Sequence, residues 1–211
     1  MLFVIVLVHL PFSSQAGLSD QYKKIILKDL KNYLTQIKSV AIDFEQIDSN
    51  GSYAKGVFIV SKPYKFRCNY YPPFPILIVG NKQYISIYDY QMEHLTRINV
   101  KDNVFNFLLI ENEDFESKFD VSSIKTIEKY HQIELINKLS NQHLLIFFDR
   151  THKQIKKVVL PEEDNQITIN LTKVTEISKP RNDLFIIRNP DVFGPIKHFD
   201  ESDIKKYLKL N

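Results

Sequence analysis

The side chains that most often do chemistry in proteins are few in this chain and are not spaced for catalysis. No HExxH or CxxC metal motif, GxSxG nucleophile motif or phosphate-binding P-loop is present. Aspartate and glutamate fall in turns and at outward strand positions, which is typical of solvated surface. We therefore expect neither an enzyme nor a protein with a metal or organic cofactor. The scattered residues are the single cysteine, Cys68, and six histidines, of which His9 lies in the N-terminal apolar run and the others are His94, His131, His143, His152 and His198.

The stretch VSKPYKFRCNYYPP (60–73) carries more information, because its apolar and polar side chains alternate. Alternation of this kind predicts a β-strand with one apolar face and one solvated face. The expected apolar face holds Phe66, Cys68 and Tyr70, and the expected solvated face holds Lys65, Arg67 and Asn69. Such an apolar face serves either as permanent core or as the lining of a site for an apolar ligand.

An amphipathic helix is predicted just before the first strands. In SDQYKKIILKDLKNYLTQIKSV (19–40), apolar residues recur at steps of three and four, and lysines fall mostly between them. Ser19 or Asp20 is a suitable N-cap. The apolar stripe of this helix requires a partner surface.

Most of the chain from about residue 40 to about residue 190 alternates over short runs separated by polar turns. This pattern predicts an antiparallel meander, which curls when it has many strands. The exception is 103–117, which favours a short helix, and 201–211 has the pattern of one or two further helical turns. The predicted fold is therefore mainly β: a single curved antiparallel sheet that forms an unclosed barrel, covered by the long N-terminal helix and the short middle helix.

The N-terminal residues indicate export. An apolar run at 2–10 is followed by a proline, small polar residues and a small-x-small triplet at 14–16. This is typical of a secretory signal peptide, and the run is too short to span a bilayer. We expect a signal peptide (1–16) followed by a single domain (17–211). The net charge of +3, from 28 basic and 25 acidic residues, is too balanced to favour nucleic-acid binding.

The order of these segments resembles the outer-membrane lipoprotein carrier family, LolA. After the helix come a strand ending in DFEQ (43–46), the stretch GVFIVSKPYKFRCNYYPP (56–73), an apolar run, and GNKQYISIYDYQMEHLT (80–96). LFIIRNP (184–190) resembles the closing strand of that family. The resemblance spans roughly residues 1–195 and rests on the ordered series rather than on one motif.

The resemblance implies a function. An incomplete barrel with helices across its mouth as a lid would take the acyl chains of lipoproteins into an apolar cavity. The protein would act in the periplasm as a monomer, without making or breaking a bond. Its partners would be acylated lipoproteins, an ATP-driven lipoprotein-releasing transporter of the inner membrane and a receptor at the outer membrane. The alternative is a periplasmic module of the same fold that senses lipids or lipoproteins.

The resemblance and the alternation together mark the candidate site residues. Lys62 lies where the family commonly has an arginine that latches the lid, and the alternative for it is a solvated residue beside a proline. For the cavity candidates the alternative is static core. These candidates are Phe66, Cys68 and Tyr70 on the strand, Leu30, Tyr33 and Leu34 on the first helix, and Leu108 and Leu109 on the middle helix.

Overall fold

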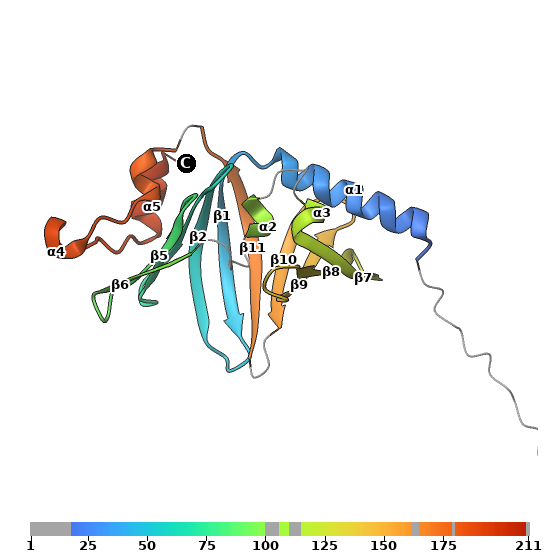
Figure 1. Ribbon diagram of the computed structural model, residues 1–211, viewed down its shortest axis with the longest axis horizontal. Helices are drawn as coiled ribbons and strands as arrows, with labels where there is room; N and C mark the ends of the chain where they lie inside the picture. The colour runs from blue at the N-terminus through green and yellow to red at the C-terminus, as the bar shows by residue number, and fades with distance from the viewer. Residues whose placement is uncertain (1–17, 100–105, 110–114, 162–164, 179, 210–211) are drawn as a thin grey trace, which may run out of the picture.

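One antiparallel sheet of eleven strands organises the molecule (Figure 1). The computed structural model describes residues 18–99, 106–109, 115–161, 165–178 and 180–209, so the expected signal peptide (1–16) lies outside the described residues. The strands are β1 (Ser39–Asp48), β2 (Tyr53–Ser61), β3 (Lys65–Tyr70), β4 (Ile76–Gly80), β5 (Tyr84–Asp89), β6 (His94–Asn99), β7 (Phe119–Ile127), β8 (Tyr130–Asn137), β9 (His143–Asp149), β10 (Ile155–Pro161) and β11 (Gln166–Glu176).

The strand order explains the shape. It runs β6-β5-β4-β3-β2-β1-β11-β10-β9-β8-β7, so two meanders meet where β1 pairs with β11. Among the described strands, β6 and β7 are the outer ones, and each pairs on one side only. The sheet curls without closing, which confirms the predicted unclosed barrel.

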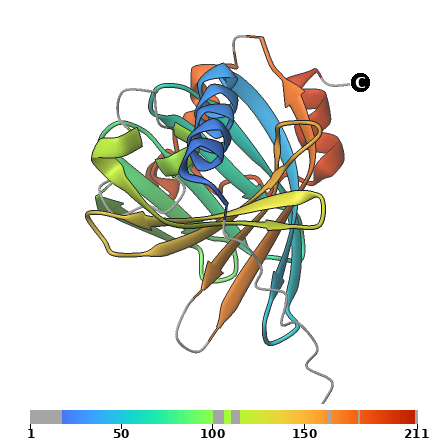
Figure 2. The same ribbon diagram turned by 90° about the vertical axis from the view of Figure 1, so that its right-hand side faces the viewer.

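Helix α1 (Asp20–Gln36) lies across the concave side of the sheet. Ser19 caps it, because its Oγ accepts a hydrogen bond from the backbone N–H of Tyr22 at 3.3 Å. The apolar stripe of the helix buries Ile26, Leu30 and Leu34 in one cluster with the concave-face side chains. Figure 2 looks nearly along α1 and shows the sheet curving beneath it.

The predicted middle helix takes the form of two short helices in the described residues. α2 spans Asn106–Leu109 and α3 spans Phe115–Lys118, while 103–105 and 110–114 lie outside the described part. Phe107, Leu108, Leu109 and Phe115 are buried in the same cluster as α1. Both short helices therefore cover the concave face, as expected.

The convex face is also covered, by the C-terminal part of the chain. This part contains η3 (Asn182–Phe185), α4 (Pro190–Phe193) and α5 (Glu201–Leu208). Leu184, Phe185, Ile187 and Ile204 pack against the outward-facing side chains of β1, β2, β4 and β5 in a second apolar cluster. The expected closing strand at 184–190 is wrong, since this stretch begins with a 3-10 turn and contains no strand. The C-terminal helical turns are present as α5 and dock on the sheet.

The predicted solvated face of β3 is likewise wrong. Arg67 is 5% exposed and Asn69 is 1% exposed, because the C-terminal part of the chain lies over both. Lys65 is half-buried, and its Nζ donates to the side-chain oxygen of Asn182 at 2.7 Å. A polar residue on an alternating strand can face either water or a polar partner from a distant segment, and alternation does not distinguish the two.

Hydrogen bonds join this buried face to its cover. The Arg67 guanidinium donates to the carbonyl of Leu184 at 3.3 Å and to Asn69 Oδ1 at 3.1 Å, and it lies 5.4 Å from the centre of the Phe199 ring. Asn69 Nδ2 donates to the carbonyl of Phe199 at 3.0 Å. Burial lowers the pKa of Arg67. Buried polar groups of this kind are expensive to leave unpaired, so the cover is firmly fixed.

We predict that Arg67→Ala destabilises the protein by about 2–3 kcal/mol, because it leaves buried hydrogen-bond acceptors unpaired and opens a cavity. Release of the desolvated charge offsets part of this cost. The matched control is Arg97→Ala, which also removes a hydrogen bond to a C-terminal carbonyl, that of Ile187, but from a more exposed site. Thermal melts and limited proteolysis should show early loss of 180–209 in Arg67→Ala only. Equal melting temperatures of the two variants would contradict the role of Arg67 in holding the C-terminal part of the chain.

Candidate functional site

A small apolar cavity lies on the concave face, between the middle of the sheet and α2. Its volume is about 30 Å³, which is room for about one or two water molecules. The side chains around it come from β1, β2, β3, β10, β11 and α2 and are almost all aliphatic or aromatic. They are Ile42, Phe44, Phe58, Cys68, Tyr70, Phe107, Leu108, Val158, Ile169 and Leu171.

Strand β3 contributes two of its three predicted residues to this lining. Cys68 and Tyr70 line the cavity, whereas Phe66 lies outside the lining. Phe66 stacks on Phe58 with ring centres 5.6 Å apart. Its ring also lies directly against the backbone of Gly80, where an added Cβ would be only 1.9 Å from a ring carbon. Phe66 is therefore packed tightly between Phe58 and Gly80 and supports Phe58, which lines the cavity.

The polar atoms of the lining are neutral. Burial raises the pKa of the Cys68 thiol to about 12, so the sulfur stays protonated and behaves as a small apolar group. Burial also raises the pKa of Tyr70. The Tyr70 hydroxyl donates to Gln46 Oε1 at 2.6 Å, and Gln46 Nε2 donates to Asp48 Oδ1 at 2.9 Å. The lining carries no charge, which suits a hydrocarbon ligand.

The lid candidates occupy different places. Leu30 and Leu34 are buried beneath α1, and Tyr33 is half-buried with its ring edge-on to Phe148 at 6.1 Å. On α2, Leu108 lines the cavity, whereas Leu109 is buried nearby without lining it. All of these side chains lie on the concave side of the sheet. Their role in lipid binding stays a prediction.

Several lining residues were not singled out from the sequence. Phe107 belongs to the same apolar run as Leu108, and the run gives no sign of which side chain faces the sheet. The others belong to β1, β2, β10 and β11, whose alternating patterns were visible but whose meeting at one place follows from the strand order. They are Ile42, Phe44, Phe58, Val158, Ile169 and Leu171.

Lys62, in the turn after β2, contacts the C-terminal end of α1. Its Nζ donates a 2.7 Å hydrogen bond to the backbone carbonyl of Leu34, and its backbone N–H donates to the carbonyl of Lys38 at 2.8 Å. The last carbonyls of a helix have no partner within the helix and carry partial negative charge. Lys62 therefore ties the end of α1 to the turn between β2 and β3.

Two further polar contacts hold the rest of α1. Asp29 forms an ion pair with Lys153 at 2.9 Å, and Lys31 forms one with Glu116 on α3. All four side chains are at least partly exposed, and exposed ion pairs contribute little, typically about 0–1 kcal/mol each. The attachment of α1 to the sheet thus depends mainly on apolar contact.

Groups that could hold a metal ion do not gather in the described residues. No cluster of three or more His, Cys, Asp or Glu side chains with metal-binding geometry occurs among them. Within the same residues, no helix has the length and apolar character needed to cross a membrane. The concave cavity is therefore the best-supported candidate site.

Comparison with known proteins gives consistent matches. Residues 35–188 match the family described as "Outer membrane lipoprotein carrier protein LolA". An uncharacterized protein of Rickettsia prowazekii is 44% identical over 185 residues, which cover 87% of each chain. An outer-membrane lipoprotein carrier protein of Chromobacterium violaceum is 32% identical over 85 residues, which cover 39% of this chain and 41% of that protein.

Solved structures are more distant. A LolA superfamily protein from Nitrosomonas europaea has a TM-score of 0.49 and 7% identity, with 78% of this chain and 97% of that chain covered. The lipoprotein LppX of Mycobacterium tuberculosis has a TM-score of 0.39 and 7% identity, with 76% and 99% covered.

The N-terminal half of α1 covers a buried histidine. His131 on β8 is 2% exposed, its ring meets that of Tyr22 edge-on at 5.8 Å, and its Nδ1 lies 3.1 Å from the Thr126 hydroxyl. Burial lowers the pKa of His131, the cations Arg150 and Lys153 lower it further, and Asp29 opposes them. The folded protein therefore disfavours protonation of this ring.

We predict that acid loosens α1 through His131. As the pH falls below about 6.5, the unfolded chain takes up this proton more readily than the folded one, so the stability present above that pH is lost. The test compares about pH 7.5 with about pH 5.5, which lie on either side of the ordinary histidine pKa. At the lower pH, hydrogen exchange of α1 should be faster and the melting temperature lower.

The control variants separate His131 from other titrating groups. His131→Phe should remove most of the pH-dependent loosening, whereas His143→Gln, which changes a more exposed histidine on β9, should retain it. A His131→Phe variant with the same pH dependence as the unchanged protein would contradict this role.

Proposed function

The chain belongs to the LolA family of outer membrane lipoprotein carrier proteins, and we propose from this premise that it carries lipoproteins across the periplasm. It would receive acylated lipoproteins from an ATP-driven transporter in the inner membrane and deliver them to the outer membrane or a receptor there. The single observation that carries the proposal is the uncharged apolar cavity between the sheet and α2, on the concave side that α1 also covers. No covalent bond changes in this process, so the protein would not be an enzyme.

The physical need for such a carrier follows from the free energy of hydrocarbon in water. Burial of one methylene is worth about 0.8 kcal/mol, so one long acyl chain gains on the order of 10 kcal/mol by leaving water. A lipoprotein with several chains would not cross an aqueous compartment unaided. A lining with a protonated thiol and a neutral tyrosine has the uncharged character that such a chain requires.

The size of the cavity supports a lid that exchanges with the cargo. A volume of about 30 Å³ is far too small for an acyl chain. Cargo would therefore displace side chains that now fill the concave side, beginning with Phe107 and Leu108 of α2. The cargo replaces their apolar contacts, so both loading and release cost little net free energy.

The Lys62–Leu34 hydrogen bond would set the balance between the two states. A hydrogen bond from a charged donor contributes roughly 1.5–3 kcal/mol. This bond exists only while the end of α1 stays near the β2–β3 turn, so it favours the closed state. In this role Lys62 would act as the latch of the lid.

The side chains of α2 provide the direct test. Leu108→Ala enlarges the cavity and weakens the closed state, so it should raise affinity for a fluorescent fatty-acid probe by up to about tenfold. Leu109→Ala is the matched control, because Leu109 is buried on the same helix without lining the cavity.

The unchanged protein and the Leu108→Ala variant should also be isolated from the native cell envelope. Mass spectrometry should detect acylated lipoproteins with the unchanged protein and at least as much with Leu108→Ala. Absence of both probe binding and co-purified acylated protein would refute the proposed function.

Lys62 provides an independent test of the latch. Lys62→Arg offers more donors to the last carbonyls of α1, so it should favour the closed state and lower probe affinity by up to about tenfold. Lys62→Met keeps an unbranched side chain only one atom shorter, without the charge, and should raise the affinity. In probe titrations, the affinity should be highest for Lys62→Met, intermediate for the unchanged protein and lowest for Lys62→Arg. Equal affinities would show that the hydrogen bond does not control the lid.

A further inference from the structure

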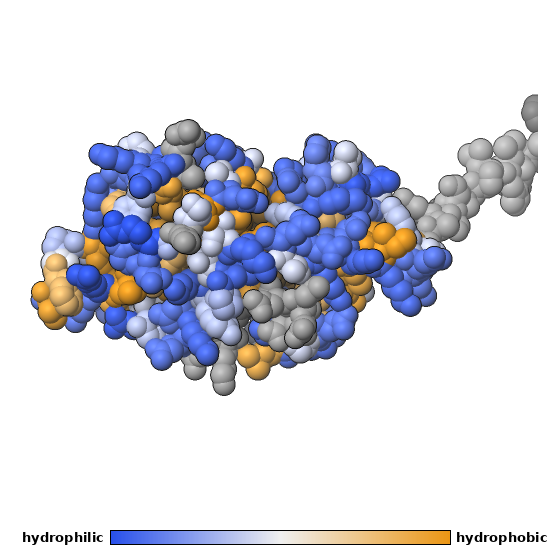
Figure 3. Space-filling view, turned by 90° about the horizontal axis from the view of Figure 1, so that it is seen from above, coloured by the Kyte–Doolittle hydropathy of each residue, from blue (hydrophilic) through white to orange (hydrophobic). Residues whose placement is uncertain are grey.

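Large apolar side chains are exposed at the end of the molecule opposite α1. Val192 and Phe193 on α4 are 70% and 65% exposed, and Ile186 just before the helix is 58% exposed. Figure 1 shows α4 as an outlying turn beyond β6 and α5, and Figure 3 shows apolar atoms gathered at that end. Isolated exposed apolar residues are ordinary, but adjacent ones on a projecting element call for an explanation.

The projecting turn is well ordered by its own backbone. Asn189 caps it by accepting from the Asp191 N–H at 3.1 Å, Pro190 begins the helix, and Gly194 ends it with φ of 82° and a 2.9 Å hydrogen bond to the carbonyl of Pro190. Ile187 and Ile196 pack into the convex apolar cluster on either side. The fold therefore holds Val192 and Phe193 outward instead of letting them collapse onto the sheet.

Cations lie over the exposed aromatic rings in this region. Lys82 lies 5.3 Å from the ring centre of Tyr64, Arg97 lies 5.4 Å from that of Tyr84, and Arg188 lies 5.4 Å from that of Phe193. We call these three pairs, together with Val192, the cation–aromatic surface. Among the described residues, none of the three cations forms an ion pair with a carboxylate.

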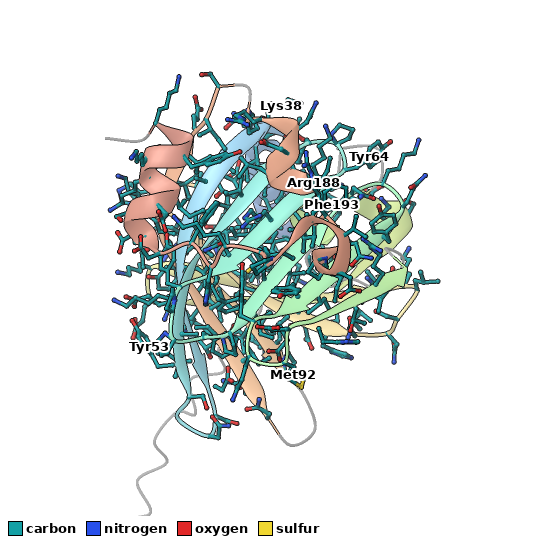
Figure 4. All side chains as sticks on the ribbon, turned by 90° about the vertical axis from the view of Figure 1, so that its left-hand side faces the viewer. Lys38, Tyr53, Tyr64, Met92, Arg188 and Phe193 are labelled. Atoms are coloured by element: carbon teal, nitrogen blue, oxygen red, sulfur yellow. The ribbon has the colours of Figure 1, made fainter. Side chains whose placement is uncertain are left out.

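The three pairs are neighbours on one face. Lys82 and Tyr84 belong to the same turn and strand start, and Arg97 donates to the carbonyl of Ile187 at 3.4 Å, next to Arg188. Figure 4 shows Tyr64, Arg188 and Phe193 together on the convex side of the sheet. The cation–aromatic surface therefore extends over one side of the sheet, from the β2–β3 turn to α4.

We propose that the cation–aromatic surface binds the surface of an anionic lipid bilayer. Aromatic rings and basic side chains with apolar stems are the groups that settle at the boundary between headgroups and acyl chains. Phe193 and Val192 would enter that boundary, while Lys82, Arg97 and Arg188 would pair with lipid phosphates. Cations without a carboxylate partner in the described part of the chain provide charge complementarity to such a surface.

A bilayer fits this surface better than a protein partner does. The exposed apolar tip is convex and small, whereas a stable protein interface buries about 800 Å² on each partner with matched shapes. A bilayer adapts to a projecting tip and requires no complementary pocket. The three cations and Phe193 lie outside the concave cluster, so membrane contact would leave the cavity uncovered.

The test uses co-sedimentation of the full chain with lipid vesicles. Vesicles of phosphatidylethanolamine with phosphatidylglycerol should bind the protein, binding should weaken with salt, and pure phosphatidylcholine vesicles should bind it less. Arg188→Ala should weaken binding about fivefold, the value expected for loss of one basic residue near an anionic surface. Phe193→Ser should weaken it at least as much.

The matched control is Leu139→Ser, which removes a 66% exposed leucine from the β8–β9 turn and should bind like the unchanged protein. Phe193→Ser should also keep its affinity for the fatty-acid probe, since Phe193 lies outside the concave cluster. This result separates the inference from the proposed carrier function. Failure of the unchanged protein to bind anionic vesicles, or equal weakening by Leu139→Ser, would overturn the proposal and leave a protein partner as the occupant of this surface.

Discussion

A curved sheet that does not close leaves its concave apolar side chains without a facing sheet, and this constraint governs the whole molecule. A closed barrel of small size fills its interior with its own side chains. Here two meanders meet at β1 and β11, and the strands at both ends pair on one side only in the described part. Something other than a strand must cover the concave side, and α1, α2 and α3 supply apolar side chains for it.

The two faces of the sheet are covered by different physical means. The convex cover is joined by hydrogen bonds to buried groups, including Arg67, Asn69 and the carbonyl of Tyr70, which accepts from His198 at 3.0 Å if that ring nitrogen is protonated. The concave cover is attached mainly by apolar contact, with polar ties at the margins of α1. Apolar contacts can be replaced by those of another hydrocarbon, whereas directed buried hydrogen bonds cannot. The exchange with cargo proposed above therefore concerns the concave cover, while directed hydrogen bonds fix the convex one.

The sequence was most informative where a local pattern decides the structure. Alternation identified the inward residues of β3, and the apolar stripe of the first helix identified Leu30 and Leu34 as buried. Alternation did not predict the burial of Arg67, because the carbonyl that accepts its hydrogen bond belongs to Leu184, 117 residues away. It also missed Phe107, since a short apolar run reveals burial but not the side of the helix that faces the cavity. Contacts between distant segments depend on strand order, which periodicity does not encode.

The small size of the concave cavity has a consequence for the discovery of inhibitors. A compound that enters the site must push aside Phe107 and Leu108, so it exchanges one set of apolar contacts for another. Rigid docking into this structure would reject compounds of useful size, because the cavity of about 30 Å³ has no room for them. A screen that detects binding by a rise in melting temperature would also undervalue them, since the compound replaces packing that already stabilises the closed form. Competition against a bound acyl probe is the assay that this geometry favours.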